Sequence, residues 1–180
     1  LVVWTERVTV EARSLDDAGV TYTRNVAANP AAVGWAAPFL YWTGDSPVLG
    51  LMRDTIDKTG YQQIVPGNTF TANSGLVTDD GGVYFANAGG AGVFAIDNGD
   101  AGPALRKLAP TINRPSTSSF RVAVDGTNVY WTEGSTSPGA PDGRVLAAPR
   151  GALDAAAPAV VSTGERDPTF IVSSGDGYVY

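Results

Sequence analysis

Residues 122–133 read Val-Ala-Val-Asp-Gly-Thr-Asn-Val-Tyr-Trp-Thr-Glu, and the second half of this stretch recurs along the chain. The recurring phrase is a small or aliphatic residue, one or two aromatic residues and then a small polar residue. Its copies are Val2-Val3-Trp4-Thr5, Leu40-Tyr41-Trp42-Thr43, Val83-Tyr84-Phe85-Ala86, Val129-Tyr130-Trp131-Thr132 and Val179-Tyr180. Equivalent positions are separated by 38, 43, 46 and 50 residues. A motif that recurs at such a period indicates a repeat architecture.

An apolar residue precedes the phrase at a constant distance. Val33, Leu76, Val122 and Val172 each stand eight residues before a tyrosine. The intervening turns are Gly34 to Pro38, Asp79-Asp80-Gly81-Gly82, Asp125-Gly126-Thr127-Asn128 and Gly175-Asp176-Gly177. Asp-Gly and Gly-Gly between β-branched and aromatic runs predict tight hairpins, because Gly, Asp and Asn tolerate the positive φ of such turns. Each repeat is therefore predicted to begin with a β-hairpin.

Two further strand-like runs follow each phrase. The first set is Arg7 to Leu15, Gly50 to Asp57, Gly92 to Asp97 and Gly143 to Arg150; the second is Val20 to Ala27, Tyr61 to Gly67, Ala104 to Pro110 and Pro158 to Thr163. Four short strands in a unit of roughly 40–50 residues are typical of a β-propeller blade. A β-sandwich explains the composition equally well, but it does not explain the constant spacing of eight residues. We predict an all-β fold, a β-propeller of four-stranded antiparallel blades, of which the chain supplies about four.

The repeat divides residues 1–180 into predicted blades. Residues 1–29 supply the second, third and fourth strands of an incomplete blade, residues 30–72, 73–118 and 119–168 supply complete blades, and residues 169–180 begin a further one. Because both ends of the chain fall inside the repeat, we expect it to be part of a ring of six to eight blades. The alternative is a closed ring of four blades, in which Phe170 to Gly175 completes the first blade.

Composition narrows the classes of function. The net charge is −6 and the chain has only two lysines, Lys58 and Lys107. The absence of a basic stripe argues against nucleic acid and anionic membranes as partners, and no apolar run is long enough to span a bilayer. The chain has no cysteine and no histidine, which removes thiol nucleophiles, Ser-His-Asp triads and most transition-metal sites. Richness in Gly, Ala, Thr and Ser with little Lys is typical of an extracytoplasmic bacterial protein.

The sequence Tyr130-Trp131-Thr132-Glu133 resembles the YWTD repeat of propellers of the low-density-lipoprotein-receptor type. Gly143 to Ala148 stands where that family has a glycine-led third strand, and Val122 to Trp131 is similar to repeats of secreted bacterial YWTD-like and NHL-like propellers. The resemblance covers nearly the whole chain and implies the propeller fold rather than a particular activity. The chain departs from the family at the fourth position of the repeat, which is Glu6, Gly44, Asn87 or Glu133 and never Asp. The receptor domains also have six blades.

The loops that join blades, and the loops that join the second strand of a blade to its third, form the usual ligand face of a propeller. Loops on a rigid scaffold concentrate binding residues. The predicted ligand-binding residues on this face are Asp45, Asn113, Arg114, Glu133 and Arg166, with Glu165 and Asp167 as neighbours. The competing interpretation is that these side chains are solvated loop charges.

Several other patterns have a structural interpretation beside a functional one. Trp4, Trp42 and Trp131 could stack on sugars, but their place in the repeat favours a core between blades, whereas Trp35 is predicted to plug or line the channel. Asp79-Asp80-Gly81 and Asp176-Gly177 could suggest calcium, but the spacing of an EF-hand loop is absent and turn formation explains them. No cofactor, metal site or catalytic motif is therefore predicted.

Three functions remain open. The first is a non-enzymatic, extracytoplasmic propeller that binds a protein or a glycan through its loop face. The second is a hydrolase or lyase that uses carboxylates or a metal bound by loops, since the spacing of Asp and Glu does not decide their geometry. The third is a self-assembling structural module whose exposed blade edge pairs with another chain.

Overall fold

The structure is a computed structural model, and it describes most of the chain. The described residues are 1–15, 21–26, 30–44, 50–66, 75–79, 82–87, 92–99, 102–110, 121–137, 139–153, 157–166, 168–174 and 178–180. All regular secondary structure in these ranges is β-strand. The predicted all-β fold class is confirmed.

The strands form four antiparallel sheets, each made of strands that are consecutive in the sequence. The first sheet consists of β1 (Val2–Glu6), β2 (Thr9–Arg13) and β3 (Thr21–Asn25). The second consists of β4 (Pro30–Ala36), β5 (Phe39–Gly44), β6 (Gly50–Thr55) and β7 (Gln62–Pro66). The third consists of β8 (Leu76–Asp79), β9 (Gly82–Asn87), β10 (Gly92–Gly99) and β11 (Gly102–Pro110). The fourth consists of β12 (Val122–Val124), β13 (Asn128–Glu133), β14 (Gly143–Pro149) and β15 (Ala159–Glu165).

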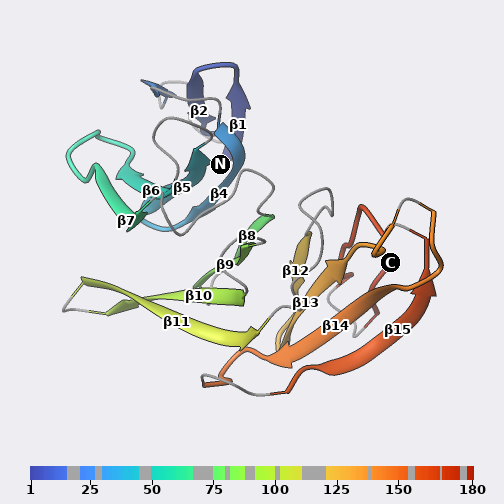
Figure 1. The fold of residues 1–180 in the computed structure, drawn as a ribbon. Helices are drawn as coiled ribbons and strands as arrows, with labels where there is room; N and C mark the ends of the chain where they lie inside the picture. Colours follow the sequence, from blue (N-terminus) through green and yellow to red (C-terminus); the bar gives the residue numbers. More distant parts are fainter. Residues whose placement is uncertain are drawn as a thin grey trace.

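The four sheets follow one another around an arc in the order of the chain (Figure 1). Strand β4 contacts β1 and β8, and β8 contacts β12, so the first strands of successive complete sheets lie side by side along the inner edge. Strands β7, β11 and β15 form the outer edge, and the N- and C-termini lie beside the first and the fourth sheet, respectively. A short hairpin follows the fourth sheet, in which Ser173 pairs with Val179. The predicted blade boundaries and the number of blades in a ring stay predictions.

In β5 and β9, adjacent residues face different neighbouring sheets. In β5, Trp42 packs toward the first sheet, whereas Tyr41 packs toward the third. The core between the first and second sheets contains Val10, Ala12, Tyr22, Leu40, Trp42 and Met52. The core between the second and third sheets contains Tyr41, Leu51, Val65, Val83, Phe85 and Ile96. The two neighbouring aromatics of the repeat thus serve two interfaces, because side chains alternate across a strand.

The prediction that the repeat tryptophans lie in a core between blades is confirmed for Trp42 and Trp131 and wrong for Trp4. Trp42 and Trp131 are 1% and 0% exposed, but Trp4 is 37% exposed. Trp4 lies on the face of β1 that points away from the second sheet, while its neighbour Val3 packs toward that sheet. The cross-strand partner of Trp4 is the charged Glu11. At the equivalent positions, the partner of Trp42 is the apolar Met52 and that of Trp131 is the apolar Leu146. No sheet in the described structure covers this face of β1, so the ring of Trp4 stays partly in water. Trp35 packs against the core between the first and second sheets.

The predicted hairpins of β8 with β9 and of β12 with β13 form, and the turn of the second uses different chemistry from that expected. Gly82 has a positive φ of 148°, whereas Gly126 does not. The turn at Gly126 is held instead by the carboxylate of Asp125, which accepts hydrogen bonds from the backbone N–H groups of Thr127 and Asn128, both at 2.7 Å. An Asx turn of this kind stabilises a hairpin without a positive φ.

The turn predicted from Gly34 to Pro38 begins later than expected, because β4 continues to Ala36. Gly34 is needed for close packing rather than for a turn: a Cβ atom at Gly34 would lie 2.5 Å from Cγ2 of Thr78. The absence of a side chain at Gly34 therefore lets β8 approach β4.

Candidate functional site

The described candidate residues meet at one end of the fourth sheet. Glu133 ends β13 opposite Arg144, and Glu165 ends β15 opposite Gly143. Arg166 follows directly and is exposed. We call this region, residues 133–137, 139–144, 165–166 and 168–170, the loop end of the fourth sheet. The other candidates, Asp45, Asn113, Arg114 and Asp167, lie outside the described residues.

The side chain of Glu133 is buried and paired with an arginine, not exposed on a loop. It was expected in a loop, but it is the last residue of β13 and its side chain is fully buried. Nη2 of Arg144 donates a hydrogen bond to Oε2 of Glu133 at 2.5 Å. A buried carboxylate requires such a partner, because burial of an unpaired charge is costly. The ion pair clamps the start of β14 to the end of β13, where the long loop leaves the sheet.

The loop between β13 and β14 is held by its own hydrogen bonds. The hydroxyl of Ser135 donates to the carbonyl of Ala140 at 2.6 Å. The backbone N–H and the hydroxyl of Thr136 donate to the two carboxylate oxygens of Asp142, at 3.0 Å and 2.5 Å. Thr136, Ser137 and Pro141 are exposed. The described residues of the loop therefore present polar side chains from a backbone that these hydrogen bonds hold in place.

Close packing joins this loop to the segment after β15. A Cβ atom on Gly143 would lie 2.6 Å from Cδ of Pro168 and 2.7 Å from the carbonyl oxygen of Glu165. The hydroxyl of Ser135 also lies 3.4 Å from that carbonyl oxygen. Gly143 thus permits a contact that any side chain would block, and it brings the two segments of the loop end together.

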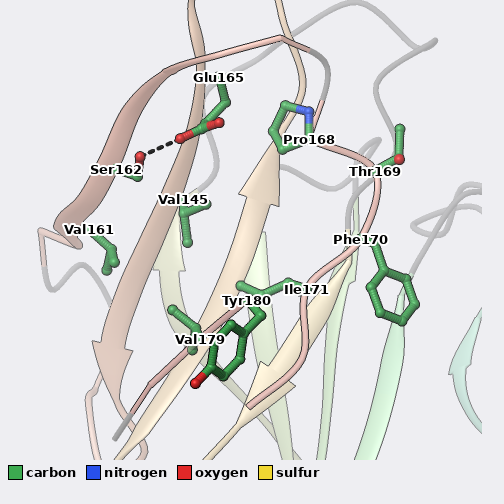
Figure 2. Close-up of a pocket in the computed structure, with 10 residues that line it drawn as sticks. All are labelled: Val145, Val161, Ser162, Glu165, Pro168, Thr169, Phe170, Ile171, Val179 and Tyr180. Carbon is green, nitrogen blue, oxygen red and sulfur yellow. Dashed lines mark hydrogen bonds between the residues drawn. The ribbon is translucent and has the colours of Figure 1, made fainter. Parts of the chain in front are cut away.

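A pocket of about 540 Å³ lies beside the loop end, between the fourth sheet and the C-terminal hairpin (Figure 2). Its walls come from β14, from β15 and from the segment after β15. They are formed by Val145, Val161, Ser162, Glu165, Pro168, Thr169, Phe170, Ile171, Val179 and Tyr180. The lining is mixed: apolar and aromatic side chains alternate with the polar groups of Ser162, Glu165 and Thr169. The hydroxyl of Ser162 donates to Oε1 of Glu165 at 2.5 Å. The sequence did not indicate this pocket, because its walls are brought together only by the packing of the hairpin.

Charged side chains elsewhere tie neighbouring sheets together. Asp54 is fully buried, and it accepts hydrogen bonds from Nε of Arg24 at 2.6 Å and from the hydroxyl of Tyr22 at 2.8 Å. Burial and the hydrogen bond to Asp54 raise the pKa of Tyr22. These three residues join the first sheet to the second.

A second tie joins the third sheet to the fourth. The guanidinium of Arg150 donates to the hydroxyl of Tyr84 at 2.8 Å and to a carboxylate oxygen of Asp79 at 2.9 Å. It also donates to the carbonyl of Asp125 at 3.0 Å. The carboxylate of Asp79, considered above as a calcium ligand, is thus paired with a cation. Asp80, Gly81, Asp176 and Gly177 lie outside the described residues.

Clusters of metal-binding side chains and membrane-spanning helices are both absent from the part of the chain that the structure describes. No group of three or more Asp, Glu, His or Cys side chains there is placed to hold a metal ion. No helix of the described residues is long and apolar enough to cross a membrane.

Comparison with known proteins gives relatives in structure but not in sequence. No protein family and no curated protein matches the sequence. A chain in the crystal structure of the nidogen/laminin complex matches with a TM-score of 0.65 and 17% identity over 96% of this chain. This chain spans 64% of the length of that chain. A structure of puromycin hydrolase matches with a TM-score of 0.48 and 19% identity over 79% of this chain and 25% of that one. The first match, a β-propeller, together with the arc of antiparallel sheets, shows that this chain has a β-propeller fold.

Proposed function

We propose that this β-propeller is a non-enzymatic scaffold that binds another protein through the loop end of its fourth sheet. The observation that carries the proposal is the loop between β13 and β14, whose described residues are held by hydrogen bonds of Ser135 and Thr136. Close packing at Gly143 joins this loop to the segment after β15, which carries the exposed side chains of Arg166 and Phe170. A loop that is already ordered loses less conformational entropy when it binds. Exposed arginine and aromatic side chains among polar groups are a composition typical of protein interfaces.

A protein ligand has more support than a glycan. Sugars stack on exposed aromatic faces, but Trp42 and Trp131 are buried between sheets, and the partly exposed Trp4 lies on the first sheet rather than at the loop end of the fourth. The structural relative in the nidogen/laminin complex is, by its description, part of an assembly of proteins. That relationship is one of fold, and it supports protein binding as an activity that such a scaffold can have.

The buried carboxylates of the described residues have structural partners, which favours a scaffold over an enzyme. Asp54 binds Arg24 and Tyr22, Glu133 binds Arg144, and Asp125 organises a turn. A catalytic acid or base must be free to exchange a proton with a substrate. We propose no hydrolase activity for this chain.

We also propose an extracytoplasmic location of the bacterial secreted type. The support is compositional: the chain has two lysines, no cysteine, a net charge of −6 and many small polar residues. Fusion of the chain to a reporter enzyme that is active only outside the cytoplasm, in its native host, tests this location. Reporter activity confined to the cytoplasm would contradict it.

The test of binding uses the chain immobilised on a surface. A displayed peptide library and an array of glycans are both applied, and the affinities of the selected ligands are measured for wild type and for Asp142→Ala. This substitution removes the carboxylate that Thr136 hydrogen-bonds and leaves the length of the loop unchanged. The matched control is Gly126→Ser, at the opposite end of the same sheet, where an added Cβ meets open space.

We expect peptide ligands that lose about tenfold or more in affinity to Asp142→Ala and bind Gly126→Ser as they bind wild type. Ligands that are all glycans, or peptides equally affected by both variants, would refute the proposed site.

A further inference from the structure

The loop between β13 and β14 is rich in hydroxyl-bearing, proline and small residues. Residues 134–141 read Gly-Ser-Thr-Ser-Pro-Gly-Ala-Pro and contain no charged side chain. Segments rich in Ser, Thr and Pro are typical carriers of O-linked sugars, because they keep their hydroxyl groups outside a packed core. The hydroxyl groups of Ser135, Thr136 and Ser137 are therefore candidate acceptors of a sugar.

Two of these three hydroxyl groups are engaged in the fold. Ser135 is 5% exposed, and its hydroxyl donates to the carbonyl of Ala140. Thr136 is exposed, but its hydroxyl donates to the carboxylate of Asp142, which also accepts the backbone N–H of Thr136. To enter the active site of another enzyme, the hydroxyl of Thr136 would have to leave a charged acceptor, and hydrogen bonds to charged acceptors are the strong ones.

The third hydroxyl group, on Ser137, is accessible. The side chain of Ser137 is exposed, and its hydroxyl makes no hydrogen bond in the part of the chain that the structure describes. The carbonyl of Ser137 accepts a hydrogen bond from the N–H of Ala140 at 3.0 Å, and Gly139 has a positive φ of 74°. This combination is typical of a β-turn that starts at Ser137. Ser137 thus lies at a turn, outside the strands β13 and β14.

Exposed hydroxyl groups elsewhere in the described residues differ from that of Ser137. Thr59 donates to the carboxylate of Asp57, and Thr127 donates to that of Asp125. The exposed threonines of β3 belong to a hydrogen-bonded strand. Thr169 is exposed, but it stands alone between a proline and a phenylalanine rather than in a run of hydroxyl-bearing residues. Composition and structure together therefore select Ser137.

We propose that Ser137 is a site of O-glycosylation. The donor is a sugar phosphate carried on a lipid. Oγ of Ser137 attacks the anomeric carbon of the sugar, the bond from that carbon to the phosphate oxygen breaks, and its electron pair leaves with the phosphate. The proton of the hydroxyl passes to a base of the transferase. This modification goes beyond the binding function proposed above, and it rests on the extracytoplasmic location proposed there.

The test uses the protein purified from its native host. After proteolysis, the peptide that contains residues 134–142 is analysed by mass spectrometry with fragmentation that keeps sugars attached. We expect an added mass of one or more whole sugar residues on Ser137, which alkaline β-elimination removes.

Three variants made in the same host test the choice of residue. Ser137→Ala should reduce the glycosylated form of the peptide about tenfold or more, because alanine has no hydroxyl to donate. Ser137→Thr should keep the sugar, since it restores a hydroxyl. Thr136→Val is the matched control, which removes the neighbouring hydroxyl and should leave the sugar on Ser137.

A further variant tests whether the hydrogen bond to Asp142 protects Thr136. In Ser137→Ala/Asp142→Ala the hydroxyl of Thr136 loses its charged acceptor. We expect the sugar to appear on Thr136 in this double variant but not in Ser137→Ala alone.

An unmodified peptide, a phosphate on Ser137, or a sugar on Ser135, Thr136 or Thr169 of the wild type would each overturn the proposal. The reporter fusion described above separates two kinds of failure. An unmodified peptide from an exported protein rejects the glycosylation alone, whereas an unmodified peptide from a protein that stays in the cytoplasm rejects the location as well.

Discussion

At the scale of the residue, Asp125 determines a turn through several donors at once. Burial opposes its ionisation, but hydrogen bonds from the hydroxyl of Tyr130 and from the N–H groups of Asn128 and Thr127 outweigh that effect and lower the pKa of Asp125 to about 2. The sequence indicated a turn here from Asp-Gly. It did not indicate which group would hold the turn. An Asp-Gly sequence fits equally well a turn held by the aspartate carboxylate and a turn with a positive φ at the glycine.

This pKa predicts how stability changes in acid. An aspartate in an unfolded chain titrates near a pKa of about 3.9. Because the folded value is lower, ionised Asp125 stabilises the fold above about pH 4, and this contribution is lost as the pH falls toward 2. We expect the free energy of unfolding of wild type to fall by about 2 kcal/mol more than that of Asp125→Asn between pH 5 and pH 2. Urea unfolding at both pH values measures it, and parallel pH profiles would contradict it.

At the scale of the element, the strands could be predicted well and the reasons for individual glycines less well. Alternating β-branched and aromatic residues with turn signals located the strands, including β10 and β14. Gly34 was taken for a turn residue because glycine is favoured both in turns and where two backbones approach closely. Only the packing of β8 on β4 distinguishes the two, since it places the side chain of Thr78 where a Cβ of residue 34 would be.

Gly34→Ala should therefore weaken the contact between the second and third sheets. Its Cβ would lie 2.5 Å from Cγ2 and 2.8 Å from Oγ1 of Thr78. Thr is stiff at χ1, so we expect a loss of about 1–3 kcal/mol in the free energy of unfolding. Thr78→Ala alone removes the hydrogen bond from the N–H of Trp35, at 3.0 Å, which costs about 1 kcal/mol.

The double variant Gly34→Ala/Thr78→Ala provides the check by urea unfolding. Because the second change removes the obstructing atoms, the combined loss should be smaller than the sum of the single losses by about 1 kcal/mol. Strictly additive losses would show that Thr78 is not the obstacle.

At the scale of the whole molecule, position in the arc decides what a repeated residue does. Trp4 and Trp131 occupy the same place in the repeat, yet Trp131 is enclosed between the third and fourth sheets and Trp4 faces water. The sequence alone treats the copies as equivalent. It likewise could not indicate the pocket, whose walls at Val145 and Tyr180 are far apart in the chain. Of the predicted site residues, Glu133 and Arg166 lie at the loop end of the fourth sheet, but their role in binding stays a prediction.

The two tryptophans give a matched pair of substitutions. We expect Trp131→Ala to lower the free energy of unfolding by about 3–5 kcal/mol, and Trp4→Ala to lower it by less than about 1 kcal/mol. Trp131→Phe should be milder than Trp131→Ala, since it keeps a ring and removes an indole N–H that has no partner among the described residues. Denaturant unfolding of the three variants measures the losses, and similar losses at Trp4 and Trp131 would contradict the difference in burial.

The alternation of Tyr41 and Trp42 across β5 has a consequence for the order in which the molecule opens. In the part of the 180-residue chain that the structure describes, the second, third and fourth sheets each contribute to two cores, whereas the first sheet contributes to one. Displacement of β5 or β9 breaks contacts on both sides, but β1 to β3 can separate while every other core stays intact. Native-state amide hydrogen exchange should therefore be fastest in β1 to β3 and slowest in β5 and β9, so that the chain opens from its first sheet inward.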